Sequence, residues 1–159
     1  MRRLTFLPGL LLALAVASPA AAVAPTSVRV EVVRTFIAGE CPGFEVLGEF
    51  HIVRTETTFH DAAGTPLRRI THVSLAGSRL INATTGTWLA AGGVRIITID
   101  LVNGGSTSTG TNVHVVVRGT GTVDISAGRF AQNAEGDIVF EAGRMDGPIT
   151  DALCAALAG

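Results

Sequence analysis

The stretch Val94–Val117 reads Val-Arg-Ile-Ile-Thr-Ile-Asp-Leu-Val, then Asn-Gly-Gly-Ser-Thr-Ser-Thr-Gly-Thr-Asn, then Val-His-Val-Val-Val, and the expected fold follows from it. Two runs dense in β-branched residues, Val94–Val102 and Val113–Val117, flank a loop of Gly, Ser, Thr and Asn at Asn103–Asn112. This pattern is typical of a β-hairpin. Both runs are mostly without charge, so we expect each strand to be deeply buried on at least one face. A sheet must then extend on either side of the hairpin.

Apolar side chains of one parity predict the buried face of this hairpin, because successive side chains of a strand point to opposite faces. They are Ile97, Ile99 and Leu101 in the first strand and Val113, Val115 and Val117 in the second. Thr98 and His114 have the opposite parity, so we expect them on the other face.

Length and composition fit one globular domain. The chain has 159 residues, of which 47% are hydrophobic and 16% are charged, so a sizeable core is available. The formal net charge is −1, and the sequence has no basic stripe. Because phosphate contacts supply most of the affinity for nucleic acids, this composition argues against a nucleic-acid partner. The sequence contains arginine and no lysine. Together with the bias toward Ala, Gly and Val, this indicates a GC-rich bacterial genome.

The N-terminus has the features of an export signal. Met1–Arg3 is basic, Leu4–Val16 is apolar, and Ser18–Ala22 supplies small residues before a cleavage site. The apolar segment is shorter than the ~20 residues needed to span a bilayer, which argues against a membrane anchor. We therefore expect residues 1–22 to be a signal peptide and residues 23–159 to be a single β-barrel domain without a membrane span. The protein is then secreted, to the extracellular space or the cell envelope.

The chain has two cysteines, Cys41 and Cys154, and an oxidising compartment favours their pairing. The closed loop would contain nearly the whole mature domain. Chain-entropy arithmetic gives such a loop a stabilising effect of about 4–5 kcal/mol. We therefore predict one disulfide, with two free buried thiols as the alternative.

Short segments with alternating apolar residues recur at close, even spacing along the chain, with turn residues between them. We count about eight strands and find no helical crossover of the kind that parallel strands need. The C-terminal segment is predicted to be helical, because Ile149, Leu153, Ala156 and Leu157 follow the spacing of one helix face. The predicted fold class is all-β: an antiparallel up-and-down β-barrel of about eight strands with a short C-terminal helix, since closure removes exposed edges.

Three short motifs give the chain a resemblance to an uncharacterised family of small secreted bacterial proteins. The motifs are the Cys41-Pro42-Gly43 loop, the Asn-Ala-Thr-Thr-Gly turn at Asn82–Gly86, and the C-terminal Cys154. The layout is similar to lipocalin-like and allene-oxide-cyclase-like barrels. The lipocalin Gly-x-Trp signature near the first strand is missing, and no residue set of the cyclases carries over. The resemblance therefore implies a β-barrel and no particular activity.

The sequence has none of the short motifs that mark common hydrolases, nucleotide-binding loops or zinc proteases. The four histidines are not spaced as a local pair on one element, so we expect no metal and no cofactor, and we assign no catalytic residue. Polar side chains within the predicted strands are the candidates for contacts with a ligand. The candidate ligand-binding residues are Arg54, Glu56, Arg69, His72, Trp88, Asp100 and His114.

Alternatives stay open for these candidates. Arg54, Glu56, Arg69 and His72 lie on adjacent predicted strands, where they line either a polar barrel mouth or a solvated salt-bridge face. Asp100 faces either the lumen or solvent, where an arginine would pair with it. The single Trp either plugs the core or stacks on a ligand.

These features predict a secreted β-barrel module that binds a small, mostly apolar ligand, because barrel mouths are common ligand sites. One alternative is an isomerase or cyclase that acts on a hydrophobic substrate in the same cavity. Another is a non-catalytic structural or interaction protein of the cell envelope with a fully packed interior. A hollow interior lined by polar groups separates the first two from the third. Binding is favoured over catalysis because no catalytic motif is present.

Overall fold

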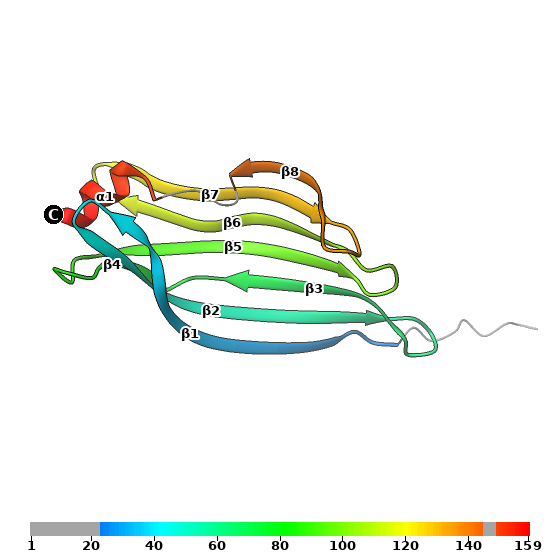
Figure 1. Cartoon of the computed structure of the whole chain (residues 1–159). Helices are drawn as coiled ribbons and strands as arrows, with labels where there is room; N and C mark the ends of the chain where they lie inside the picture. The colour runs from blue at the N-terminus through cyan, green and yellow to red at the C-terminus, as the bar shows by residue number, and fades with distance from the viewer. Residues whose placement is uncertain (1–22, 145–148) are drawn as a thin grey trace, which may run out of the picture.

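The chain forms one twisted sheet with a helix at one end (Figure 1). This computed structural model describes residues 23–144 and 149–159, so the predicted signal peptide lies outside the described residues. The elements are β1 (Thr26–Cys41), β2 (Phe44–His60), β3 (Pro66–Ser74), β4 (Ser78–Asn82), β5 (Trp88–Asp100), β6 (Ser106–Val117), β7 (Gly121–Gln132), β8 (Ile138–Arg144) and α1 (Asp151–Ala158). In these two ranges, no helix has the length and apolar character needed to cross a membrane.

All ladders between neighbouring strands are antiparallel, and the order across the sheet is β1-β2-β3-β5-β6-β7-β8. β4 pairs with β2 and β5, as β3 does, so β3 and β4 occupy one position in the sheet in succession. The predicted antiparallel all-β fold with eight strands and a short C-terminal helix is confirmed. Closure into a barrel is not confirmed, because no ladder joins β1 to β8 within the described residues.

The break between β3 and β4 is bridged by a side chain. β2 pairs with β3 over Val53–His60 and with β4 over Val46–Glu49, so the His51 N–H has no ladder partner on that side. The buried Ser78 Oγ accepts this hydrogen bond at 3.0 Å. The interruption therefore leaves the backbone donor satisfied, as buried amides must be.

The central hairpin has longer strands than the sequence predicts. β5 ends at Asp100 and β6 already begins at Ser106, and between them Gly104 and Gly105 both have a φ of 78°. The predicted loop Asn103–Asn112 is therefore wrong from Ser106 onward, because Ser106–Asn112 belongs to β6. Glycine supplies the positive φ that the turn needs, whereas the threonines that follow are good strand formers when a partner strand is available.

The core lies where α1 packs on the sheet. Leu153 and Leu157 of α1 are fully buried, and they pack in one cluster with Val46 of β2 and Val115 of β6. We call the sheet face that carries α1 the inner face and the opposite face the outer face. The predicted parity of β6 is confirmed, because Val115 is 0% exposed on the inner face whereas Val116 is 52% exposed.

A helix as short as α1 is only marginally stable on its own. Capping and a disulfide hold it in place. Thr150 is the N-cap, and its Oγ1 accepts a hydrogen bond from Leu153 N at 3.2 Å and donates one to Val123 O at 2.6 Å. Cys41 and Cys154 are bonded, with their Cα atoms 5.6 Å apart, which confirms the predicted disulfide. The bond joins the end of β1 to the helix.

Candidate ligand-binding groove

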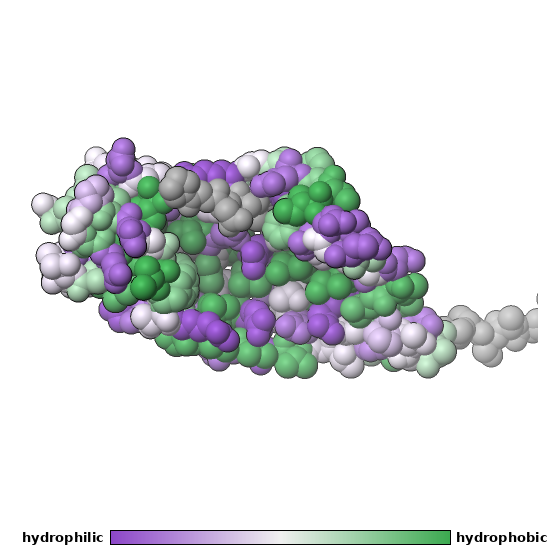
Figure 2. Space-filling view, in the orientation of Figure 1, coloured by the Kyte–Doolittle hydropathy of each residue, from purple (hydrophilic) through white to green (hydrophobic). Residues whose placement is uncertain are grey.

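The helix covers one end of the inner face, and the rest of that face is hollowed into a groove (Figure 2). The lining residues come from β1, β2, β3, β5 and β6, with the connection after β3, and the volume is about 660 Å³. Ligand pockets in proteins have volumes of roughly 300–1,000 Å³. This cavity, which we call the inner groove, is therefore large enough for a small organic molecule.

Apolar side chains form much of the wall of the inner groove. They include Val32, Phe50, Ile52, Val73, Ile97 and Val113. Phe36 also lines the groove, and its ring centroid lies 5.1 Å from that of Phe50. A smaller hollow of about 280 Å³ continues from these two rings to Leu153 of α1. The lining of this smaller hollow is mixed, because Asp124, Ser126 and Arg144 contribute to it beside Leu80 and Leu153.

Five charged side chains line the inner groove among the described residues. They are Arg34, Arg54, Glu56, Arg69 and Arg95. The ladders place Arg54 opposite Val73 and Val73 opposite Arg95, so these two arginines flank one valine across three adjacent strands. Figure 2 shows polar and apolar residues side by side in the hollow. The inner groove is thus apolar in its wall and positive in its net charge.

Two of these arginines have partners within the groove. Arg69 Nη1 lies 3.8 Å from Glu56 Oε2, and Arg95 Nη1 donates a hydrogen bond to Asn112 Oδ1 at 3.0 Å. The Arg69 Nε is buried and has no hydrogen-bond partner among the described residues. A buried donor without an acceptor is unfavourable. The Arg69 Nε is therefore an unsatisfied donor behind the surface of the groove, where solvent does not reach it.

The structure brings together three of the predicted site residues, namely Arg54, Glu56 and Arg69. They lie on the neighbouring strands β2 and β3, with an ion pair between Glu56 and Arg69. The sequence left open whether these side chains face a cavity or a solvated surface. In the structure they share the inner face with the apolar wall.

The two predicted histidines do not line the inner groove. His72 is exposed and follows the buried Thr71, which is a groove residue, so strand alternation turns His72 to the outer face. His114 precedes the buried Val115 in β6 in the same way. Its Nε2 lies 3.2 Å from Thr122 Oγ1. The sheet itself therefore separates both histidines from Arg54, Glu56 and Arg69.

Trp88 and Asp100 lie at the two ends of β5, away from the inner groove. Trp88 is 55% exposed, and the guanidinium of Arg79 lies 5.8 Å from the centre of its ring. Asp100 Oδ1 accepts hydrogen bonds from Val102 N at 2.9 Å and Asn103 N at 3.0 Å. These contacts, that of the Asn103 backbone first, hold the pKa of the Asp100 carboxyl below its ordinary value. Asp100 thus closes a turn.

Sequence reasoning missed Arg34 and Arg95 as groove residues, although strand parity contains the signal. Arg34 lies two residues after Val32, so it continues the apolar parity of β1 onto the inner face. Arg95 has the parity of Ile97 and Ile99, which are groove residues too. In each case a charged residue stands two positions from an apolar residue that faces the groove. This pattern identifies both arginines.

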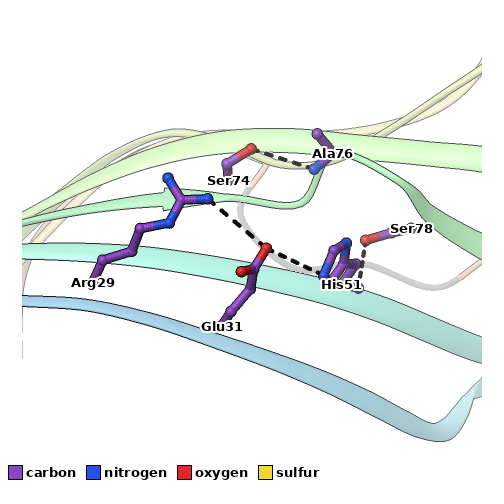
Figure 3. A network of polar contacts seen from close by, with 6 residues as sticks. All are labelled: Arg29, Glu31, His51, Ser74, Ala76 and Ser78. Atoms are coloured by element: carbon purple, nitrogen blue, oxygen red, sulfur yellow. Dashed lines mark hydrogen bonds and ion pairs between the residues drawn. The ribbon is translucent and has the colours of Figure 1, made fainter.

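A second polar cluster lies on the outer face, where β1, β2 and the connection from β3 to β4 meet (Figure 3). Glu31 Oε1 lies 3.8 Å from Arg29 Nη2 and 3.5 Å from His51 Nε2. All three side chains are exposed, and ion pairs of this kind contribute about 0–1 kcal/mol. We interpret the cluster as surface structure around the break between β3 and β4.

The described residues include no group of three or more His, Cys, Asp or Glu side chains that could hold a metal ion. Comparisons of the chain with protein-family models, with curated proteins and with solved structures find no match. The geometry and chemistry of the inner groove are therefore the basis for its functional interpretation.

Proposed function

We propose that this protein is a ligand-binding β module. More particularly, we propose a secreted protein whose inner groove takes a small, mostly apolar ligand. The observation that supports this is the groove of about 660 Å³, with an apolar wall that α1 leaves uncovered. An apolar ligand gains about 25 cal/mol for each Å² of apolar surface removed from water. In this proposal the sheet acts as a partly closed barrel, and its open side admits the ligand.

Binding is favoured over catalysis by the side chains that face the groove. General acid–base catalysis needs a group that can exchange a proton with the substrate. Among the described lining residues, Glu56 is the one carboxylate, no histidine is present, and Glu56 is paired with Arg69. A structural protein with a fully packed interior is disfavoured as well, because α1 fills only one end of the inner face and the groove beside it is open.

Titration with Nile red, a neutral apolar dye, tests the proposed function. Ile97→Trp adds a large side chain inside the inner groove and is expected to weaken dye binding about tenfold or more. Ile96→Trp adds the same side chain at the next position, on the outer face, and is expected to bind the dye like the unaltered protein. Circular dichroism checks that both variants fold. Unchanged binding by Ile97→Trp, or equal weakening in both variants, contradicts the proposal.

A further inference from the structure

The charged side chains of the inner groove give it a net positive charge beside its apolar wall. Four of the 12 arginines of the chain line the groove, each from a different strand, and Glu56 alone opposes them among the described lining residues. The net charge of the chain is −1, so this positive charge is a local property of the groove. A cleft with charge of one sign and apolar walls attracts ligands of the opposite sign.

The ladders place two of these arginines side by side. Arg54 and Arg95 both pair with Val73, which is 7% exposed and lies between them. Neighbouring strands lie about 4.8 Å apart, so the two arginine Cα atoms are separated by about 10 Å on the same face. Two long side chains can converge across that distance on one anion above the valine. The planar guanidinium also matches the oxygens of a carboxylate or phosphate in a bidentate manner.

Several donors in the groove have no acceptor among the residues that the structure describes. Arg34 and Arg54 make neither an ion pair nor a side-chain hydrogen bond within the described part of the chain. Arg69 pairs through its Nη1, whereas its buried Nε has no partner among the same residues. The guanidinium groups of Arg34 and Arg54 are therefore available to the acceptor oxygens of a ligand, whereas the buried Arg69 Nε is closed to solvent.

We propose that the inner groove binds an amphipathic anion. The apolar body of the ligand packs on the wall at Phe50 and Ile52, and its acidic head group accepts hydrogen bonds from Arg54 and Arg95, with Arg69 as a third donor. This inference rests on the proposed function and adds the chemical class of the ligand to it. A carboxylate and a phosphate share the required chemistry, because both present charged oxygens to guanidinium groups.

Calorimetric titration with three probes of equal chain length tests the inference. The probes are dodecanoate, dodecyl phosphate and dodecan-1-ol, each below the concentration at which it aggregates. We expect at least one of the two anions to bind about tenfold or more tightly than the neutral alcohol, since hydrogen bonds to charged groups are stronger than those to neutral groups. The anion that binds more tightly identifies the head group as a carboxylate or a phosphate.

Arginine variants locate the head-group site. Arg54→Gln and Arg95→Gln are each expected to weaken binding of the preferred anion about tenfold and binding of dodecan-1-ol less than about twofold. Arg118→Gln is the matched control, because it removes the same charge from the exposed turn that follows β6. This control is expected to bind all three probes like the unaltered protein.

Each contrary outcome has a distinct meaning. Equal binding of the three probes by the unaltered protein overturns the head-group inference and leaves the proposed function standing. Equal weakening by Arg118→Gln and Arg54→Gln also overturns the inference, because the preference would then arise from overall charge. Failure of all three probes to bind contradicts the proposed function itself, and the inference with it.

Discussion

At the residue scale, Asn82 connects a turn to the C-terminal helix. It is 2% exposed, and its Nδ2 donates a hydrogen bond to Leu157 O at 3.2 Å. Its Oδ1 accepts from Thr84 N at 2.9 Å and from Thr85 N at 3.1 Å. The Asn-x-x-Thr-Gly pattern predicts the turn. It does not predict the contact with the helix, because Leu157 lies 75 residues further along the chain.

We expect Asn82→Ala to lower the free energy of unfolding by about 2–3 kcal/mol, because it leaves the buried Leu157 carbonyl and two turn amides without their partner. Asn133→Ala is the control: Asn133 Oδ1 accepts from Asp137 N at 2.8 Å in an exposed turn, so its loss is expected to cost about 1 kcal/mol or less. Urea unfolding measures both variants. Equal losses would show that the contact between Asn82 and the helix contributes nothing beyond its turn.

Two turn aspartates, Asp61 and Asp100, are expected to make the stability of the fold depend on pH. Asp61 Oδ1 accepts from Thr65 N and Ala63 N, both at 2.8 Å. The hydrogen bond from the Thr65 backbone is the main cause that lowers the pKa of Asp61 below 3.8, and that from the Asn103 backbone acts in the same way on the pKa of Asp100. A lowered pKa means that the folded state favours the carboxylate. The resulting stability is present above the ordinary pKa and is lost as the pH falls through the lowered value.

The melting temperature is therefore expected to fall as the pH is lowered from about 5 to below the ordinary pKa of these carboxyls. The double variant Asp61→Asn, Asp100→Asn is expected to show a shallower fall, because neither amide titrates. Glu135→Gln, at an exposed position in the turn between β7 and β8, serves as the control and is expected to keep the full dependence. The same slope in the double variant and the unaltered protein would refute this assignment.

At the scale of one strand, β6 separates the core from the outer surface between adjacent residues. Val115 is 0% exposed and Val116 is 52% exposed. We expect Val115→Ala to lower the free energy of unfolding by about 2–3 kcal/mol, from lost transfer energy and the cavity left behind. Val116→Ala is expected to change it by less than about 0.5 kcal/mol. Chemical denaturation compares them, and similar values would mean that the outer face of β6 is covered as well.

Local pattern predicts strands better than it predicts their ends. Alternating valines identify the buried parity of β6, and that parity is confirmed at Val115. The start of the same strand is missed, because Ser106–Asn112 is rich in residues that suit loops as well as strands. Pairing decides the matter: Ser106 lies opposite Ile99, a partner that local composition does not reveal.

At the scale of the whole molecule, the disulfide between Cys41 and Cys154 closes a loop with a sequence separation of 113. Such a loop contributes about 4–5 kcal/mol in the chain-entropy model. We expect a reductant to lower the melting temperature of the protein. The double variant Cys41→Ser, Cys154→Ser is expected to melt at the lower temperature with or without reductant. The same melting temperature of the unaltered protein with and without reductant would contradict this prediction.

The sequence predicts the fold class and leaves the shape of the interior undetermined. Closure of a barrel depends on the accumulated twist that brings β1 and β8 together, and no local pattern encodes that sum. The size of the packed core is likewise not encoded by a local pattern. The apolar spacing of α1 identifies Leu153 and Leu157, whereas the length of sheet that the helix leaves uncovered depends on where Cys154 is tied. The sequence therefore predicts Arg54, Glu56 and Arg69 as site residues without predicting the groove that they line.

We expect the position of the disulfide to give the molecule two ends of different stiffness. Cys41 and Cys154 lock the end that holds α1, whereas ladder hydrogen bonds hold the tips of β2 and β5 at the opposite end (Figure 1). Strands that are free of a cross-link can flex at their tips while the locked end keeps its shape. A groove that is compliant at one end adjusts to the length of its occupant. Affinity for a series of alkyl chains is then expected to rise gradually with chain length. A rigid closed cavity would instead impose an abrupt cut-off in affinity at one chain length.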